Sequence, residues 1–223
     1  MLAAVPLFAF GGAALACVLI YVMAWHDGVD PVRIILSGVA INTVLGAYNA
    51  FLQMLNSDNL ANVLAFMNGS RVHGALMWMV GGLAARSWPH VQIILPYAAI
   101  GLLFALASAA YLNILQLGDE MATSLGINVS WVRVFLSAVG AFLAASTVAV
   151  VGLLGFVGLV VPHAARLLIG SDYRYLLPAS ALLGIAIVTL SDTFARVVFA
   201  PIELPVGIIM AFLGAPFFLF LLR

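Results

Sequence analysis

Long, almost uninterrupted apolar runs dominate the pattern of hydrophobic and polar positions along the chain. Each run is close to the roughly 20 residues that a helix needs to cross the hydrocarbon core of a bilayer. Strands of a membrane barrel are about ten residues long and alternate apolar with polar positions, which these runs do not. The pattern therefore predicts seven membrane-spanning helices, at Leu2–Trp25, Val32–Leu55, Val91–Leu115, Trp131–Val151, Leu153–Ile169, Leu176–Val198 and Leu204–Leu222.

A half-polar segment separates the second and third runs, from Ser57 to His90. It holds two apolar patches, "VLAFM" and "ALMWMVGGL", and it is interrupted by Arg71, His73 and Arg86. Charged side chains are costly inside a bilayer, so this segment is expected to form an interfacial or re-entrant helix rather than a span.

The composition supports the same class of protein. The chain is 65% hydrophobic and 7% charged, whereas a soluble domain carries about 25% charged residues. The sequence therefore predicts an all-α fold, a polytopic transmembrane helical bundle that forms a single domain over residues 1–223.

Three compositional features argue against other functions. The formal net charge is zero, which argues against nucleic acid as a partner. Lysine is absent, and a phosphate-binding P-loop requires one, so this chain does not hydrolyse ATP in that way. Cys17 is the only cysteine, so no disulfide forms within the chain.

The arginines predict the orientation, because cytoplasmic loops of membrane proteins are enriched in basic residues. One set of connections holds five arginines and the other holds three, which favours the first set as cytoplasmic and places the C-terminus inside. Seven spans would then put the N-terminus outside, where no charged residue precedes Asp27, so further N-terminal helices are expected to be missing. The first set is Arg33, Arg133, Arg166, Arg174 and Arg223, and the second is Arg71, Arg86 and Arg196.

Candidate chemistry begins with a segment on the predicted cytoplasmic side, "LGDEMATSLGINVSWVR" at Leu117–Arg133. Asp119 and Glu120 fit the N-terminus of a helix, where the helix dipole favours negative charge. Gly126 fits a left-handed stop at the C-terminus of that helix. The enclosed helix has about two turns and is far too short to cross a bilayer.

Met121 and Leu125 are four residues apart and therefore share one face of this short helix. An exposed apolar knob on such a helix indicates a docking site for a cytoplasmic partner. The alternative is an ordinary capped loop, and spacing alone favours that alternative.

A second candidate is the segment "GLLGFVGLVVPHAARLLIGSDYR", which places Gly152, Gly155 and Gly158 ahead of a Pro162–His163 pair in an apolar run. A proline in a helix frees a backbone carbonyl group one turn earlier. Glycines three residues apart let another backbone approach closely. The pattern predicts a tight reversal or a broken helix over residues 152–158, between two spans.

His163 lies near the cytoplasmic end of this run, three residues before Arg166. An ionisable side chain inside a membrane indicates a proton relay or a metal ligand. The structural alternative is an interfacial histidine that hydrogen-bonds a neighbouring carbonyl group. No second histidine, cysteine or carboxylate stands at ligand spacing, which favours the structural role.

Asp192 and Arg196 are four residues apart in the sixth run and can pair on one helix face, which lowers the cost of either charge in a membrane. Spacing alone favours a structural ion pair. The next segment, "APIELPVG", places two prolines around Glu203 and predicts a rigid exterior turn. In the last run, Gly214 and Pro216 predict a kink.

Five segments, each weak by itself, together resemble a known family. They are "LSGVA", "LNILQLGDEMATSLGINV", "GFVGLVVPHAARLLIGSDYRYLLP", "LSDTFAR" and "ELPVGIIMAFLGAPFFLFLL". In this order they resemble the permease subunits of type II ABC importers for iron-siderophore, haem and cobalamin, the FecCD/BtuC-like family. The resemblance runs from about "LSGVAINTVLGA" to the C-terminus.

The resemblance implies a permease that works as a homodimer or heterodimer in the lipid bilayer and contacts two further kinds of protein partner. Two cytoplasmic ATPase subunits would dock on a coupling loop at residues 117–130, and a substrate-binding protein would dock outside. ATP and magnesium would bind in the ATPase subunits, so this chain would bind no cofactor and would not be an enzyme. The implied ATPase contacts are Gly118, Asp119, Glu120, Met121, Ala122, Leu125 and Gly126.

The resemblance also implies roles for residues elsewhere in the chain. Arg196 matches an outer arginine that pairs with carboxylates of the binding protein. The translocation path would run along the dimer interface, with the cytoplasmic gate around residues 29–32. The path residues would be Val29, Asp30, Pro31, Val32, Asn42 and Gly207, and residues with a structural role would be Gly155, Gly158, Pro162, His163 and Pro216.

The chain departs from the family pattern in two places. The family fold has about ten spans, and this chain starts in what resembles the fourth, so it is a fragment, has a misplaced start, or is a short variant. An element of the family occurs twice, as "LAFMNGS" at 64–70 and "LMWMVGG" at 76–82. Which copy forms the short outer helix stays open.

The leading hypothesis is therefore the permease subunit of an ABC importer that carries an iron chelate (siderophore or haem) or cobalamin. It would lie in the cytoplasmic (inner) membrane of a bacterium or archaeon. One alternative is an intramembrane metal-binding protein or enzyme that uses His163 and Asp192. Another is a helical scaffold without transport activity, and only the transporter needs the coupling loop.

Overall fold

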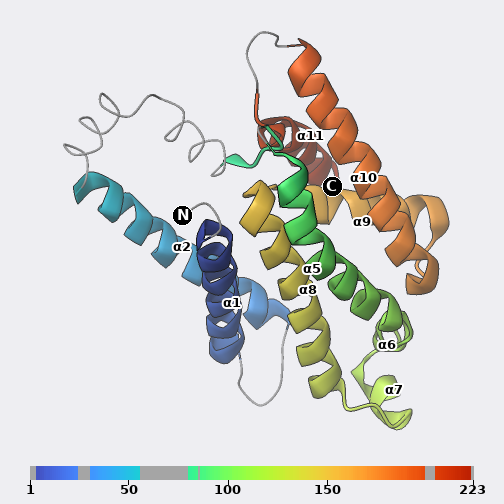
Figure 1. The fold of residues 1–223 in the computed structure, drawn as a ribbon. Coiled ribbons are helices and arrows are strands. Elements are labelled where there is room, and N and C mark those ends of the chain that lie inside the picture. Colours follow the sequence, from blue (N-terminus) through green and yellow to red (C-terminus); the bar gives the residue numbers. More distant parts are fainter. Residues whose placement is uncertain (1–3, 25–30, 56–79, 85, 199–203, 222–223) are drawn as a thin grey trace, which may run out of the picture. The chain divides into compact units, whose positions relative to one another are not determined.

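The computed structural model describes residues 4–24, 31–55, 80–84, 86–198 and 204–221, and every regular element in these ranges is an α-helix (Figure 1). The chain divides into two compact units, Met1–Leu76 and Met77–Arg223. The helical fold predicted from the apolar runs is confirmed.

The described part of the first unit consists of α1 (Ala4–Ala24) and α2 (Pro31–Leu55), which pack against each other. Gly38 of α2 faces α1, and a Cβ placed on it would lie 3.9 Å from Cδ1 of Ile20. Both helices match the first two predicted spans to within a few residues.

The second unit contains a pair of long helices that lie side by side, α5 (Trp88–Ala107) and α8 (Val129–Val151) (Figure 1). The Tyr97 and Phe142 rings have centroids 6.2 Å apart, and Phe104 meets Phe135 edge-on, also at 6.2 Å. Because the later residue of α5 meets the earlier residue of α8, the two helices run antiparallel. Both ring arrangements are favourable for aromatic side chains.

The third predicted span, Val91–Leu115, is two helices rather than one. α6 (Ala109–Leu115) begins after Ser108, whose hydroxyl donates to the carbonyl oxygen of Phe104 at 2.6 Å. A serine that bonds back onto its own helix in this way often bends it. Beyond the break, α6 packs against α10 (Tyr173–Val198).

Three helices of the second unit pack on one another: α9 (Val157–Ile169), α10 and α11 (Val206–Leu221). A buried polar contact joins two of them, because the Ser191 hydroxyl donates to Sδ of Met210 at 3.4 Å. Almost completely buried side chains on these helices are Val161, Ala165, Leu176, Ala195, Val206 and Met210.

The predicted reversal before α9 is confirmed. α8 ends at Val151, Gly152 has a φ of +84°, and the chain stays non-helical until α9 begins at Val157. Phe156 has a left-handed φ of +63°, which is uncommon for a bulky residue. The Phe156 side chain occupies the space where a Cβ on Gly214 of α11 would lie, so α9 and α11 approach closely there.

Two details of the prediction for this region are wrong. The span expected at Leu153–Ile169 begins at Val157 and has 13 residues, fewer than a helix needs to cross a bilayer. The close backbone approach expected at Gly155 and Gly158 is not seen, because nothing lies within 4 Å of a Cβ placed on either residue. Gly158 lies inside α9, whose helix continues through Pro162.

Close backbone approach occurs instead where three segments meet, a place that we call the glycine junction. The Gly82 N–H donates to the Val151 carbonyl at 3.0 Å, and the Gly207 N–H donates to the Gly81 carbonyl at 3.0 Å. Gly81 has a φ of +79°, and a Cβ on Gly207 would overlap the carbonyl oxygen of Val80. Main-chain bonds thus join the segment before α5 to the end of α8 and the start of α11.

The two ends of the second unit carry different arginines. At one end, the α7 end, α7 (Asp119–Ser124) lies against the end of α6 and the start of α8. The start of α10 bonds to the end of α6, and the end of α9 bonds to the start of α10, so both belong to the same end. Arg133, Arg166 and Arg174 lie at this end, whereas Arg86 and Arg196 lie at the glycine-junction end. Both groups agree with the two sets predicted from the sequence. Arg33 lies in the first unit, and Arg71 and Arg223 lie outside the described residues.

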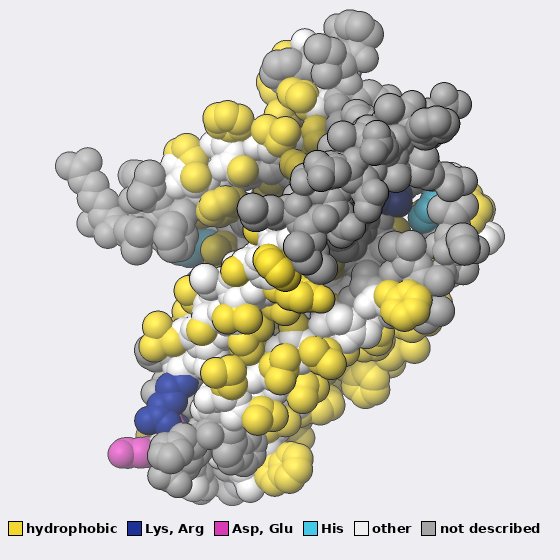
Figure 2. All heavy atoms as spheres, turned by 90° about the vertical axis from the view of Figure 1, so that its left-hand side faces the viewer, with side chains coloured by type: hydrophobic (Ala, Val, Ile, Leu, Met, Phe, Trp, Pro, Cys, Tyr) yellow, Lys and Arg dark blue, Asp and Glu magenta, His cyan; other side chains and the backbone are white. Residues whose placement is uncertain are grey.

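The helices present apolar side chains outward, as a protein in lipid does. Among the described residues, three helices are long and apolar enough to cross a membrane by length and composition: Trp88–Ala107, Val129–Val151 and Tyr173–Val198. Figure 2 shows that most described side chains on one face are hydrophobic. Shorter apolar helical stretches are Phe10–Ala24, Arg33–Tyr48, Val157–Ile169 and Val206–Phe217.

The glycine junction predicts a sharp difference between two glycine substitutions. Gly207→Ala places a methyl group against the Val80 carbonyl and should lower the stability of the protein by about 1–3 kcal/mol, as overpacking does. Gly158→Ala is the matched control, because Gly158 is also the second residue of its helix but has open space around it. Thermal unfolding in detergent micelles measures both, and equal melting temperatures for the two variants would contradict the junction.

Candidate partner-docking site

The short helix α7 forms as the sequence predicts. It begins at Asp119 and is flanked by Gly118 with a φ of +97° and Gly126 with a φ of +82°. The Gly126 N–H donates to the Thr123 carbonyl at 2.9 Å, and the Ile127 N–H donates to the Ala122 carbonyl at 3.1 Å. These two bonds satisfy carbonyl groups that a helix C-terminus leaves free.

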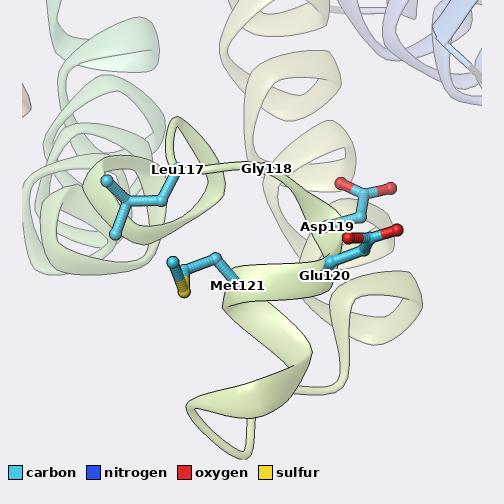
Figure 3. Close-up of a pocket in the computed structure, with 5 residues that line it drawn as sticks. All are labelled: Leu117, Gly118, Asp119, Glu120 and Met121. Carbon is cyan, nitrogen blue, oxygen red and sulfur yellow. The ribbon is translucent and has the colours of Figure 1, made fainter.

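The apolar side chains of this region point outward. Met121 is 56% exposed and Leu125 is 59% exposed, whereas Ala122 is fully buried against the rest of the unit. Leu117, which precedes α7, is 63% exposed. Figure 3 shows the side chains of Leu117 and Met121 on one side and the carboxylates of Asp119 and Glu120 on the other. All four residues, together with Gly118, line one open pocket.

An ion pair holds α7 onto α8. Arg133 donates to Oδ1 of Asp119 at 2.7 Å, with the two side chains 26% and 53% exposed. Asp119 also lies at the N-terminus of α7, where the helix dipole favours its charge. Because the pair is partly solvated, it positions α7 more than it stabilises the fold.

A second polar contact at the α7 end was not predicted from the sequence. Asp172 lies just before α10 and accepts from the Arg174 backbone N–H at 2.9 Å and from the Asn113 amide of α6 at 2.7 Å. These donors hold the pKa of the Asp172 carboxyl below its ordinary value of 3.8. The polar Asn and Gln three residues apart in "LNILQLG", and the "SD" before the sixth run, were the available signals.

At the opposite end, Asp192 and Arg196 form the ion pair that their spacing allows. Nε of Arg196 donates to Oδ2 of Asp192 at 2.8 Å, and the Arg196 side chain is 46% exposed. The pair uses one edge of the guanidinium group, so the other edge of this half-exposed side chain is left for solvent or a partner. Arg196 could therefore pair with Asp192 alone or also bind a carboxylate of a partner protein. The docking role of Arg196 stays a prediction.

His163 packs against an aromatic ring of α11. Its ring centroid lies 5.7 Å from that of Phe217, in an edge-on arrangement with an interplanar angle of 70°. Within the residues that the structure describes, no group of three His, Cys, Asp or Glu side chains could hold a metal ion. The contact gives His163 a packing role between α9 and α11.

The residues expected along a translocation path are only partly described. Val29 and Asp30 lie outside the described residues, as do Arg71, His73 and almost all of the two repeated elements. Pro31 and Val32 begin α2, and Asn42 is exposed on the same helix. Gly207 belongs to the glycine junction, and Pro216 lies inside α11, which continues through it as a helix. Their transport roles stay predictions.

The helices, the outward apolar side chains and the segregated arginines define a multi-pass α-helical membrane protein. Its distinctive feature is a short surface helix tethered at one end of the second unit. Residues 1–223 match the FecCD transport family, and the chain belongs to that family. The resemblance noted in the sequence is thereby confirmed.

Three curated relatives show the range of the family. The chain is 42% identical over 97% of its length to the iron(3+)-hydroxamate import system permease protein of Bacillus subtilis, covering 61% of it. It is 42% identical over 96% of its length to the cobalamin import system permease protein of Halobacterium salinarum, covering 55% of it. It is 37% identical over 95% of its length to the hemin transport system permease protein of Yersinia pestis, covering 60% of it.

One solved structure has the same fold. It is described as a metal-chelate type ABC transporter in an inward-facing conformation, and it superimposes with a TM-score of 0.78 at 26% identity. The match covers 96% of this chain and 63% of the other chain. This chain spans between 55% and 62% of the length of the curated relatives that it matches.

The depressed pKa of Asp172 predicts how stability depends on pH. A carboxyl group whose folded-state pKa is lowered stabilises the fold fully above its ordinary pKa of 3.8, and this contribution is lost as the pH falls through the lower folded-state value. Asp172→Asn should therefore lower the melting temperature at pH 7. The difference from the natural protein should shrink once the pH falls below about 4. A difference of equal size at both pH values would show that charge is not its cause.

Proposed function

We propose that this chain forms the membrane-spanning part of a permease subunit of an ABC importer. The importer carries a metal chelate, either an iron chelate (siderophore or haem) or cobalamin, across the cytoplasmic membrane. Membership of the FecCD transport family supports this assignment, and so do the import functions that the relatives' names carry. Those names share one substrate chemistry, a metal ion enclosed in a bulky organic ligand, so the proposal stays at that class.

The observation that carries the proposal is the exposed apolar face of α7. Met121 and Leu125 lie outside the long helices, next to the carboxylates of Asp119 and Glu120, and therefore in water rather than in lipid. Exposed apolar surface in water costs about 25 cal/mol per Å². A protein partner that covers this face removes that cost, and a cytoplasmic ATPase subunit is the partner that an importer needs.

The arginines give the sidedness of the proposed permease. Three described arginines of the second unit lie at the α7 end and two at the glycine-junction end, which supports a cytoplasmic α7 end because cytoplasmic loops are enriched in basic residues. Arg196 then lies at the outer end, where a substrate-binding protein docks. The two docking surfaces are thus at opposite ends of the same helices.

The composition suggests which subunit binds ATP and which provides the path. The chain contains no lysine and so no P-loop lysine, and we therefore assign ATP and magnesium binding to two partner ATPase subunits. The permease itself works as a homodimer or heterodimer in the lipid bilayer and provides the path. It performs no chemistry on the substrate.

The first test addresses the apolar face of α7. Met121→Asp and Leu125→Asp place a charge inside an apolar contact and should reduce co-purification of the ATPase subunit at least tenfold, because burying an unpaired charge costs several kcal/mol. Ser87→Asp is the matched control, because it adds the same charge at an exposed helix N-cap, where aspartate is favourable, at the glycine-junction end of the same unit. Normal ATPase recovery with both α7 variants would contradict the assignment.

The second test addresses Arg196. Arg196→Glu should weaken binding of the substrate-binding protein severalfold through like-charge repulsion, more strongly at low salt, since an exposed pair contributes only about 1 kcal/mol. A complementary Glu→Arg change on the binding protein should restore affinity. Surface plasmon resonance on the assembled transporter at several salt concentrations measures both effects.

The competing role for Arg196 is a private pair with Asp192. It predicts that Arg196→Ala and Asp192→Ala lower the melting temperature equally and leave the affinity for the binding protein untouched. An unchanged affinity of Arg196→Glu at low salt, in a correctly assembled transporter, would exclude the docking role.

A further inference from the structure

The side-chain amide of Asn113 bonds in two directions. Its Nδ2 donates to Oδ1 of Asp172 at 2.7 Å, and its Oδ1 accepts the backbone N–H of Tyr173 at 2.9 Å. One turn further along α6, Nε2 of Gln116 donates to the carbonyl oxygen of Ser171 at 3.0 Å. We call these five residues the α6–α10 clasp, because they join the end of α6 to the start of α10.

The clasp also reaches α9. Arg166, in the last turn of α9, donates to the hydroxyl of Tyr173 at 3.3 Å, and its guanidinium carbon lies 6.0 Å from the centroid of that ring. The Arg174 N–H adds a bond to the Asp172 carboxylate at 2.9 Å. The ends of α6, α9 and α10 are therefore held together by polar contacts that involve backbone as well as side-chain groups.

The helix α6 connects the clasp to α7. The break at Ser108 separates α6 from α5, and only three residues, from Gln116 to Gly118, separate α6 from α7. Figure 1 shows α6 and α7 following one another beyond α5. On one side α7 is joined to α8, by the short segment 125–128 and by the Asp119–Arg133 pair. On the other side it is joined by the chain to α6, which the clasp fastens to α10.

The two ties differ in stiffness. The Asp119–Arg133 pair is partly solvated and joins two flexible side chains, so it yields easily and is screened by salt. The clasp has three hydrogen bonds, two of which end on backbone groups that are fixed by the fold. Movement of α7 can therefore reach α10 through α6 and the clasp, in addition to reaching α8 directly.

We propose that Asn113 is a positioning residue that mechanically couples the docking helix α7 to α10. A partner that moves α7 then also moves the start of α10. The side chains of the Asp119–Arg133 pair change conformation to follow this movement. The coupling role rests on the proposed docking function of α7, whereas the tie itself does not. If the clasp only supported the N-terminus of α10, its loss would lower stability but leave α7 in place.

Exchanging the two polar groups tests the tie. Asn113→Asp removes the amide donor and sets two carboxylates against each other, whereas Asp172→Asn alone keeps an acceptor for Asn113. The double variant Asn113→Asp/Asp172→Asn again sets a donor against an acceptor, and the carboxylate introduced by Asn113→Asp still accepts the Tyr173 N–H. Its rescue should be partial, because Oδ1 of Asp172 accepts both the Asn113 amide and the Arg174 N–H, and an amide nitrogen there cannot accept the latter. Rescue by the double variant is expected only if the two side chains act as a pair.

Spin labels report the position of α7 in the full chain in lipid nanodiscs, with Cys17→Ser to remove the native thiol. One pair of labels at Thr123 and Leu182 measures α7 to α10, and a control pair at Thr123 and Ala138 measures α7 to α8. Asn113→Asp should broaden the α7–α10 distance distribution and leave the α7–α8 distribution narrow, and the double variant should reverse part of the broadening. Unchanged α7–α10 distances would overturn the tie.

The assembled importer tests the coupling. Asn113→Asp should retain its ATPase subunit at the natural stoichiometry. The rate of ATP hydrolysis stimulated by loaded binding protein should fall about tenfold, the factor expected for roughly one hydrogen bond. The double variant should regain part of this stimulated hydrolysis. Asn113→Ala, which removes the bonds without adding charge, replaces Asn113→Asp if that variant does not fold.

The outcomes separate this inference from the proposed function. Two results with Asn113→Asp would overturn the coupling role: full stimulation of ATP hydrolysis, or loss of the ATPase subunit as in Leu125→Asp. Neither result would contradict the proposal that the ATPase subunit docks on α7. If the natural chain binds no ATPase subunit, the proposed function fails and the coupling role fails with it. The spin-label distances then still decide whether Asn113 ties α7 to α10.

Discussion

Hydrogen bonding of the backbone in a medium without water is the constraint on which this structure depends. An N–H or carbonyl group left unpaired in hydrocarbon costs several kcal/mol, so spanning segments must be helical and each break must be bonded within the protein. Two of the described breaks follow this rule. Gly81 and Gly82 leave helical geometry and bond to the backbone of α11 and α8, and Ser108 bonds back onto α5. Polar side chains that join different helices are concentrated instead at the α7 end, where water is available.

Features that depend on neighbours in the sequence were predictable. The apolar runs identified the helices because length and uniform hydrophobicity are enough to recognise a span. The caps of α7 followed from acidic residues and Gly126, whose effects act within one turn. Asp192 and Arg196 pair because residues four apart face each other on any helix. The family could also be identified, because it rests on ordered motifs rather than on three-dimensional contacts.

Features that join distant segments could not be derived from the sequence. Ser108 interrupts a run whose hydropathy does not change, so nothing marks the end of α5. Asn113 and Asp172 are 59 residues apart, and their contact requires α6 to leave α5 for α10. Glycine spacing indicates where another backbone could approach but does not identify which one does. The approach therefore occurs at Gly207 rather than at Gly155 and Gly158.

The shortness of α9 has a consequence for the surrounding lipid. At 1.5 Å per residue its 13 residues rise about 20 Å, whereas the hydrocarbon core is about 30 Å thick. The reversal that ends in Phe156 is then located below the level at which α10, with 26 residues, emerges. The glycine-junction end of the second unit is therefore uneven, and a bilayer around α9 would have to thin locally to match the shorter helix. Bilayer thickness thus becomes a variable that acts on the strained turn at Phe156.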